Sequence, residues 1–143
     1  MAELTETYRA VVFPWHCDQN GHMNVRWYAH HFDDAGFHLW TVSGLNLSKL
    51  RERGINFVVV GNATDFVDEL KAGELLVIKS GFVELGNRSL KAVHHMYNAD
   101  TGALCATHDM VLVGIDAVTR KSAAMPDEVR ERISQKLVSI DRK

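Results

Sequence analysis

The alternation of apolar and polar residues in the first third of the chain predicts one strand and one long helix. Tyr8–Phe13 is mostly apolar and ends at Pro14, which cannot continue a hydrogen-bonded strand. Across Val25–Ser43, apolar residues recur at the three-and-four spacing of a helical stripe. Three aromatic residues lie off that stripe: Trp27, Phe37 and Trp40. We therefore expect an enclosed helix that is apolar around much of its circumference.

The second half of the chain changes to a β pattern. Four segments rich in β-branched and aromatic residues have this pattern: Ile55–Leu70, Glu74–Leu85, Arg88–Asn98 and Ala103–Ile115. Gly86 and Asn87 form a two-residue hairpin signal between two of them. A short helical turn capped by Ser48 precedes them. A last helix begins at Pro126, with an apolar stripe that reaches Ile140. The order predicts a single α+β domain over residues 1–143.

Composition and charge exclude several classes of protein. The 143 residues are 46% hydrophobic, which suits one compact domain, and 16 basic against 18 acidic residues give a net charge of −2. Proteins that bind duplex nucleic acid carry a basic excess, so we expect no nucleic-acid partner. No apolar run approaches the roughly 20 residues that span a bilayer, so we expect no membrane partner either.

The polar N-terminus and the two cysteines bear on the compartment. The first ten residues, MAELTETYRA, lack the apolar region of a signal peptide. Cys17 and Cys105 are too few for a disulfide framework. A reducing, cytoplasmic setting is the simplest interpretation.

The polar segment Trp15–Asn24 (WHCDQNGHMN) joins the first strand to the long helix and is the candidate for chemistry. Asn24 is suited to cap the helix, because its side chain can accept a hydrogen bond from a first-turn N–H. A helix N-terminus carries partial positive charge and unpaired N–H donors, which can polarise a carbonyl oxygen. Asp18 lies a few residues upstream and can supply a carboxylate to the same volume. The two features together favour attack on an acyl group.

The same segment resembles the family of 4-hydroxybenzoyl-CoA thioesterase and related acyl-CoA thioesterases. The resemblance rests on Asp18–Asn24 (DQNGHMN), then Tyr28, then Phe32–Ala35 (FDDA). These positions match the family pattern of Asp, two residues, Gly-His-x-Asn, Tyr, and an aromatic residue followed by two acids and a small residue. Weaker similarity continues at Gly73-Glu74, at residues 86–89 and at residues 115–126.

The resemblance implies the hot-dog fold, a long central helix wrapped by a curved antiparallel sheet of about five strands. It also implies a homodimer or homotetramer with active sites at subunit interfaces, an acyl-CoA substrate and no cofactor. Asp18 would be the catalytic carboxylate, either as nucleophile or as general base that activates water. The backbone N–H of Val25 would polarise the thioester carbonyl.

Four further residues are expected to contact the substrate: His22, Asn24, Tyr28 and Arg88. Each has a simpler structural interpretation. His22 can hold the loop by hydrogen bonds, Asn24 can act only as the helix cap, Tyr28 can pack in the core, and Arg88 can be ordinary surface charge. Arg120 and Lys121 are alternative cations for the CoA phosphates. We expect no metal site, because His16, Cys17 and His22 lack an established ligand spacing.

Two other functions are also compatible with the sequence. A hot-dog hydratase or dehydratase of enoyl thioesters would need a histidine placed as a base. A non-catalytic binder of acyl thioesters would need only the cavity. Cys17 is a third candidate for the chemistry, as a nucleophile, although the family pattern assigns that role to the carboxylate.

Overall fold

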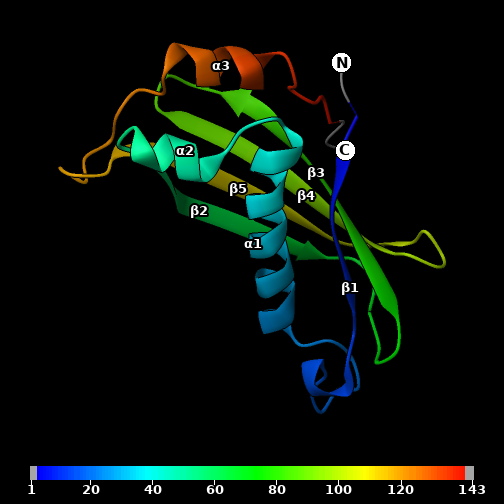
Figure 1. Ribbon diagram of the computed structural model, residues 1–143. Coiled ribbons are helices and arrows are strands. Elements are labelled where there is room, and N and C mark those ends of the chain that lie inside the picture. Colours follow the sequence, from blue (N-terminus) through cyan, green and yellow to red (C-terminus); the bar gives the residue numbers. More distant parts are fainter. Residues whose placement is uncertain (1–2, 141–143) are drawn as a thin grey trace.

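The computed structural model describes residues 3–140 and contains a curved, five-stranded antiparallel sheet that wraps around one long helix (Figure 1). The strands lie in the order β1-β3-β4-β5-β2. Their bounds are β1 Thr5–Val11, β2 Ile55–Phe66, β3 Leu75–Leu85, β4 Ser89–Asn98 and β5 Leu104–Asp116. The helices are α1 Val25–Val42, α2 Leu47–Glu52 and α3 Asp127–Ser134, with a 3₁₀ turn η1 at Pro14–His16. The predicted α+β hot-dog architecture is confirmed.

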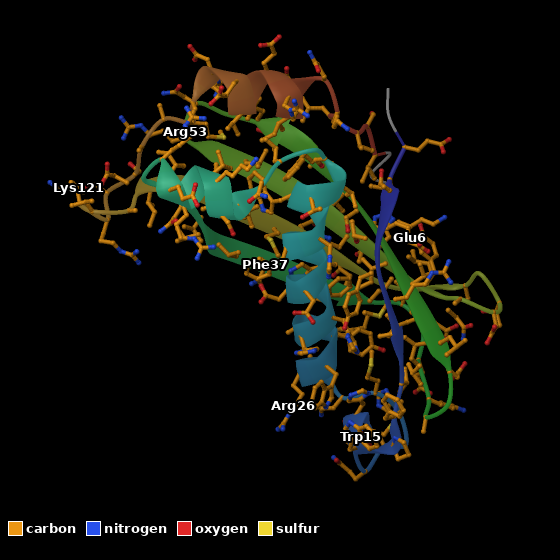
Figure 2. The ribbon with its side chains drawn as sticks, viewed as in Figure 1. Glu6, Trp15, Arg26, Phe37, Arg53 and Lys121 are labelled. Carbon is orange, nitrogen blue, oxygen red and sulfur yellow. The ribbon has the colours of Figure 1, made fainter. Side chains whose placement is uncertain are left out.

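Helix α1 begins and ends where the sequence predicts. The Asn24 side chain caps it by accepting a hydrogen bond from the Arg26 N–H at 3.1 Å. Gly44 follows its end with φ of +80°, a conformation that glycine adopts without strain. The expected enclosure is wrong for the chain by itself, because Phe37 is 60% exposed on the side of α1 that faces away from β1 (Figure 2).

The largest differences from the predicted boundaries concern the first two strands, the cap of the short helix and the end of the last helix. The first strand covers Thr5–Val11 rather than Tyr8–Phe13, and the second strand ends at Phe66 rather than Leu70. Asn46, not Ser48, caps the short helix α2 through the Lys49 N–H. Helix α3 ends at Ser134, because the chain beyond it turns back to the sheet, where the Val138 N–H donates to the Phe82 carbonyl.

The side chains of α1 and of the sheet face that it covers form two apolar clusters. One contains Phe32, Ile78 and Met96 at the end of α1 near its N-terminus. The other contains Trp40 and Phe82 near the C-terminal half of the helix. The sheet register pairs Ser80 with His94, His94 with His108, and His108 with Thr64, so these four residues cross the sheet in one line. We call these four residues, together with Thr7, the polar row.

Within residues 3–140, no helix is long and apolar enough to cross a membrane.

Candidate active site

The loop between β1 and α1 is held in place mainly by backbone hydrogen bonds and by His16. The His16 Nδ1 accepts a hydrogen bond from the Phe13 N–H at 3.0 Å, and its carbonyl accepts one from the Asn24 N–H at 2.8 Å. His16 is 8% exposed, and burial lowers the pKa of its imidazole, which keeps Nδ1 available as an acceptor. This histidine therefore fixes both ends of the loop.

Asp18 lies at the turn of this loop, where both of its carboxylate oxygens accept hydrogen bonds. Oδ2 accepts from the Asn24 side-chain amide at 2.8 Å, and Oδ1 accepts from the Asn20 N–H at 2.9 Å. Gly21 closes the turn with φ of +79° and donates its N–H to the Asp18 carbonyl at 3.0 Å. The bond from Asn24, followed by the bond from Asn20, lowers the pKa of the Asp18 carboxyl, so it is ionised at neutral pH.

Asn24 joins the carboxylate to the start of α1. Its Oδ1 caps the helix and its Nδ2 orients Asp18, so one amide fixes both groups relative to each other. Val25 is the first residue of the helix, and its N–H has no intrahelical acceptor. The result is an anionic oxygen beside a helix N-terminus that carries partial positive charge.

A cavity of about 570 Å³ opens next to these groups. The residues that line it include Asp18, Asn24 and Val25 from the loop and the start of α1. Tyr28 is buried in its wall, with its ring 5.0 Å from the Phe66 ring, and burial raises the pKa of the Tyr28 phenol to about 12. The neutral phenol and Phe66 make part of the cavity wall apolar.

The structure brings together all but one of the predicted site residues. Asp18, His22, Asn24, Val25 and Tyr28 line the same cavity. The His22 carbonyl holds the loop by accepting a hydrogen bond from the Asp18 N–H at 3.1 Å. His22 thus supports the loop through its backbone and also lines the cavity.

Arg88 lies elsewhere in the same chain. Arg88 follows the far end of β3, whose first residue, Leu75, lies at the end of the sheet near the site. Ten residues of extended strand span about 33 Å, so a distance of this order separates Arg88 from the site. Its guanidinium donates to the Ser122 carbonyl at 3.2 Å and to the Ser122 hydroxyl at 2.9 Å. Figure 2 shows Lys121 in this region, at the opposite end of the molecule from Trp15 in the site loop.

Two contributors to the site do not stand out in the sequence. His16 holds the loop, and its position directly after Pro14-Trp15 is the only local signal of a turn there. The wall formed by Phe66–Glu69 was predicted as strand, because its apolar residues continue the pattern of β2. Leu70 ties this wall to the loop, since its carbonyl accepts a hydrogen bond from the Met23 N–H at 2.7 Å.

Two alternative chemistries find little support in the geometry of this site. Cys17 does not line the cavity, and its thiol lies 3.9 Å from the Phe13 carbonyl oxygen. Within residues 3–140, no three side chains of histidine, cysteine, aspartate or glutamate are placed to hold a metal ion.

Comparison with known proteins assigns the chain to a family. The profile of the thioesterase-like superfamily matches residues 12–133. An L-carnitine dehydrogenase/betainyl-CoA thioesterase from a Rhizobium species is 25% identical over 116 residues, which are 81% of this chain and 23% of that protein. The chain thus spans about a quarter of the length of this curated relative.

Solved structures share the fold. A protein from Staphylococcus aureus determined in complex with CoA has a TM-score of 0.85 and 20% identity, and the match covers 100% of this chain and 92% of that one. A 1,4-dihydroxy-2-naphthoyl-CoA thioesterase from Synechocystis has a TM-score of 0.77 and 18% identity, with coverage of 89% and 93%. The chain has the hot-dog fold and belongs to the thioesterase-like superfamily.

Proposed function

We propose that the protein hydrolyses an acyl-CoA thioester to a free acid and CoA. The observation that carries this proposal is the pairing of an ionised, hydrogen-bonded Asp18 with the start of α1 at one cavity. Matches to a betainyl-CoA thioesterase, to a naphthoyl-CoA thioesterase and to a structure with bound CoA support the choice of CoA as the carrier.

In the proposed reaction, the thioester carbonyl oxygen accepts a hydrogen bond from the Val25 N–H. The positive end of α1 stabilises the negative charge that develops on this oxygen, a contribution worth roughly 10²–10³ in rate where a single such donor has been removed in other enzymes. The donor belongs to the backbone, so the exposed apolar side chain of Val25 does not interfere.

We assign Asp18 the role of nucleophile. A general base works best when its pKa lies near the operating pH, whereas the hydrogen bonds from Asn24 and Asn20 lower the pKa of Asp18. A carboxylate oxygen attacks the carbonyl carbon, the C–S bond breaks, and the CoA thiolate takes a proton from water. Water then cleaves the acyl anhydride, which releases the acid and restores the carboxylate.

We further propose that the protein works as a homodimer joined along β2. This strand is one edge of the sheet, it is 12 residues long, and it exposes Val59, Val60 and Phe66. A long apolar edge favours pairing with another strand, and a second copy can pair with it antiparallel about a twofold axis. Phe37 on the exposed side of α1 would be covered in the same interface.

Antiparallel pairing of β2 would bring cations from the partner copy to the site. The start of β2 lies beside the turn that contains Arg120 and Lys121, since the Ala117 N–H donates to the Gly54 carbonyl. The end of β2 leads into the cavity wall at Phe66. In the proposed dimer, the basic turn of one copy therefore approaches the cavity of the other. Arg88 reaches the CoA phosphates in this way, from the neighbouring subunit.

The proposed reaction needs water but no cofactor, since the carboxylate and the helix N-terminus belong to the chain. A reducing, cytoplasmic compartment fits the two free thiols of Cys17 and Cys105.

The test is release of free thiol from short-chain, medium-chain, long-chain and aromatic acyl-CoA substrates by wild type and Asp18→Ala. We expect turnover of at least one class and a loss of about 10²-fold or more in the variant. A single turnover in ¹⁸O-labelled water tests the role of Asp18, because only the nucleophilic route incorporates the label into its carboxylate.

Two outcomes would contradict the proposal. Tight binding of acyl-CoA without turnover, unaffected by Asp18→Ala, would make the protein a binder of acyl thioesters. Hydration of a crotonyl thioester without thiol release would make it a hydratase.

A further inference from the structure

One wall of the active-site cavity, residues 66–69, carries side chains that the proposed hydrolysis does not use. Phe66 and Val67 are 54% and 61% exposed, and Asp68 and Glu69 add two carboxylates beside them. Large apolar side chains that stay exposed at a cavity indicate a ligand or a partner that covers them. We call these four residues the Phe66–Glu69 wall.

Backbone hydrogen bonds hold this wall in place. The N–H groups of Val67 and Asp68 donate to the Cys105 carbonyl at 2.8 and 3.1 Å. Directly after the wall, the Leu70 carbonyl accepts a hydrogen bond from the Met23 N–H at 2.7 Å. The wall is therefore fixed between β5 and the active-site loop. Its backbone is in position before a ligand binds, which lowers the entropic cost of binding.

Phe66 supplies an aromatic ring to the cavity. This ring packs against the buried Tyr28, with the two centroids 5.0 Å apart and the ring planes at 88°. Tyr28 thus fixes the ring of Phe66, while about half of the Phe66 side chain stays exposed. The face of an aromatic ring attracts a positive charge that lies within about 6 Å of its centroid. Phe66 is therefore suited to contact an organic cation.

Glu69 supplies a negative charge to the same cavity. Within residues 3–140, its carboxylate accepts no hydrogen bond and forms no ion pair. Burial is the largest cause of the raised pKa of Tyr28, and the charge of Glu69 contributes to it, so this carboxylate lies near the Tyr28 ring. The neighbouring Asp68 differs, because its Oδ1 accepts a hydrogen bond from the Glu69 N–H at 2.9 Å. Glu69 is thus the carboxylate of the wall that can pair with a ligand.

The charges at the cavity favour a positively charged acyl group. Asp18, Asp68 and Glu69 line it, and no lysine or arginine of residues 3–140 does. An anionic acyl group would be repelled by these carboxylates, and a neutral one would leave Glu69 unpaired. A cationic group would be attracted to the cavity by all three charges.

A positive charge on the acyl group also favours the proposed attack. Negative charge develops on the thioester carbonyl oxygen, and the carboxylates of Asp68 and Glu69 oppose it. A cationic nitrogen beside the wall offsets this opposition. The same wall that hinders hydrolysis of a neutral acyl group therefore assists hydrolysis of a cationic one.

The distance between the start of α1 and the wall limits the acyl group to a short chain. Tyr28 follows Val25 by three residues, which is about 4.5 Å along the helix. The Phe66 ring lies 5.0 Å from the Tyr28 ring, and a cation binds within about 6 Å of a ring centroid. A carbonyl oxygen at the Val25 N–H is therefore only a few bonds away from a nitrogen at Phe66.

We propose that the active site takes a short acyl group with a cationic nitrogen, which binds between the ring of Phe66 and the carboxylate of Glu69. An alkylated ammonium group fits this pair, because its methyl groups cover the apolar ring while its charge faces the carboxylate. The inference rests on the proposed function for the thioester, whereas the cation site itself is tested by binding without turnover.

A cation of the partner copy is the alternative occupant of this site. In the proposed dimer, the basic turn with Arg120 and Lys121 approaches the cavity, where we expect it to bind the CoA phosphates. The two ends of the substrate then meet opposite charges, with the phosphates at the basic turn and the acyl cation at Glu69. If the basic turn paired with Glu69 instead, the cavity would show no preference for a cationic ligand.

The experiment measures binding of two CoA thioethers to the full chain by calorimetry. One carries a 4-(trimethylammonio)butyl group, and the other carries a 5,5-dimethylhexyl group, which has the same shape without the charge. Thioethers lack the carbonyl group, so they cannot be hydrolysed. We expect wild type to bind the cationic ligand about tenfold more tightly, as an exposed cation–π contact and an exposed ion pair together predict.

Four variants test which residues cause this preference. Glu69→Gln removes the charge but keeps the size of the side chain, and Phe66→Leu removes the ring but keeps an apolar side chain. Each is expected to reduce the preference to about threefold. Phe66→Tyr keeps a ring and should keep the wild-type preference. Asp68→Asn is the matched control, since it removes the same charge one residue away, and it should change the preference by less than about twofold.

Three outcomes would overturn the proposal. The first is equal binding of the two thioethers by wild type, or a preference that persists in Glu69→Gln and Phe66→Leu. The second is an equal loss in Asp68→Asn and Glu69→Gln, which would assign the preference to the overall charge of the cavity. The third is weaker binding of both thioethers by Glu69→Gln together with loss of the dimer in size-exclusion chromatography, which would pair Glu69 with the partner copy.

Turnover separates this proposal from the proposed hydrolysis. Thiol release is compared for 4-(trimethylammonio)butanoyl-CoA and 5,5-dimethylhexanoyl-CoA, in which three methylene groups separate the charge from the carbonyl, so the intrinsic reactivity hardly differs. We expect kcat/KM to favour the cationic substrate by about tenfold or more. Release from neither substrate, with the thioether preference intact, would contradict the hydrolysis alone. Equal release from both substrates, with equal thioether binding, would contradict the cation site alone.

Discussion

The active-site loop and the polar row stabilise opposite charge states of their titratable groups. In the loop, Asp18 is partly open to solvent and is surrounded by hydrogen-bond donors, so its charged form is stabilised. In the polar row, His94 is enclosed by apolar side chains, so its neutral form is stabilised. Both groups lie along α1 and both are fixed by neighbouring side chains.

The difference shows that solvent access, rather than residue type, decides what each group can do. A carboxylate that keeps its charge can attack a carbonyl carbon. An imidazole that loses its charge can only donate or accept hydrogen bonds, which suits recognition rather than proton transfer at neutral pH. We therefore assign the chemistry to the loop and expect the polar row to affect the stability of the fold.

The largest difference between the two regions is expected in turnover, from the substitution Asp18→Asn. This change keeps the shape of the side chain but removes the charge, so we expect turnover to fall by roughly 10²–10⁴. Stability should hardly change, because the side chain is partly solvated. Asp68→Asn is the matched control, since Asp68 lines the same cavity on its other wall. A comparable loss in both variants would mean that the negative charge of the cavity matters, not Asp18 itself.

The polar row is expected to control stability in acid. The pKa of His94 is about 3 in the folded chain, which is lower than the ordinary value of 6.5 in the unfolded chain. As the pH falls below 6.5, the unfolded state takes up the proton first, so this group removes stability between pH 6.5 and about 3. Between neutral pH and pH 4.5 we expect a loss of about 2–3 kcal/mol from His94 alone.

Urea denaturation at the two pH values measures this loss in wild type and His94→Phe. The variant should be less sensitive to acid by that amount, while the contribution of His31, whose pKa burial lowers to about 4, is the same in both proteins. Asp18→Asn should nearly keep the wild-type sensitivity between neutral pH and pH 4.5, because the ordinary carboxyl pKa of 3.8 lies below this interval and folding lowers the pKa of Asp18 further. Equal acid sensitivity of wild type and His94→Phe would contradict a neutral His94.

A smaller effect on rate is expected from Asn24→Ser. Serine caps a helix as well as asparagine does, so α1 should keep its stability. The substitution removes the amide that donates to Asp18, which is the largest cause of its lowered pKa. We expect turnover to fall about tenfold, the equivalent of one hydrogen bond, and the acidic limb of the kcat/KM profile to move to higher pH. The measurement is this profile for wild type and variant.

Asn46→Ser is the matched control for that change. Asn46 caps α2 through the Lys49 N–H and lies outside the cavity. It should leave both the rate and the pH profile as in wild type. If the pH profile of kcat/KM were unchanged in Asn24→Ser, the hydrogen bond from Asn24 would not determine the pKa of Asp18.

The two regions also differ in how far the sequence predicts them. The loop is contiguous, so Asp18, Asn24 and the helix start could be recognised within eight residues. The five strands and α1 followed from their period, apart from their ends. The segment after Ser134 was misassigned, because its apolar stripe fits a helix until Val138 pairs with Phe82.

The polar row was not visible in the sequence. His94 and His95 are neighbours in a segment with a β pattern and point to opposite faces of the sheet, while the partners of His94, Ser80 and His108, are 14 residues away on either side. Their contact depends on strand register, which the sequence period leaves open. Arg88 illustrates the same limit, since it approaches a site only in the dimer that we propose.

The smallest effect is expected from Thr64→Val, which removes the hydroxyl that pairs with His108. Thr64 is half-buried and lines a surface hollow beside α1, so water can replace its hydroxyl. We expect a loss of about 1 kcal/mol in the free energy of unfolding, at the low end for an unpaired buried group. Ser80→Ala, where the partners are enclosed, should cost more, about 2–3 kcal/mol. Equal losses, measured by urea denaturation, would mean that the surroundings of Thr64 are as dry as the core around His94. Solvent access would then no longer distinguish the two halves of the polar row.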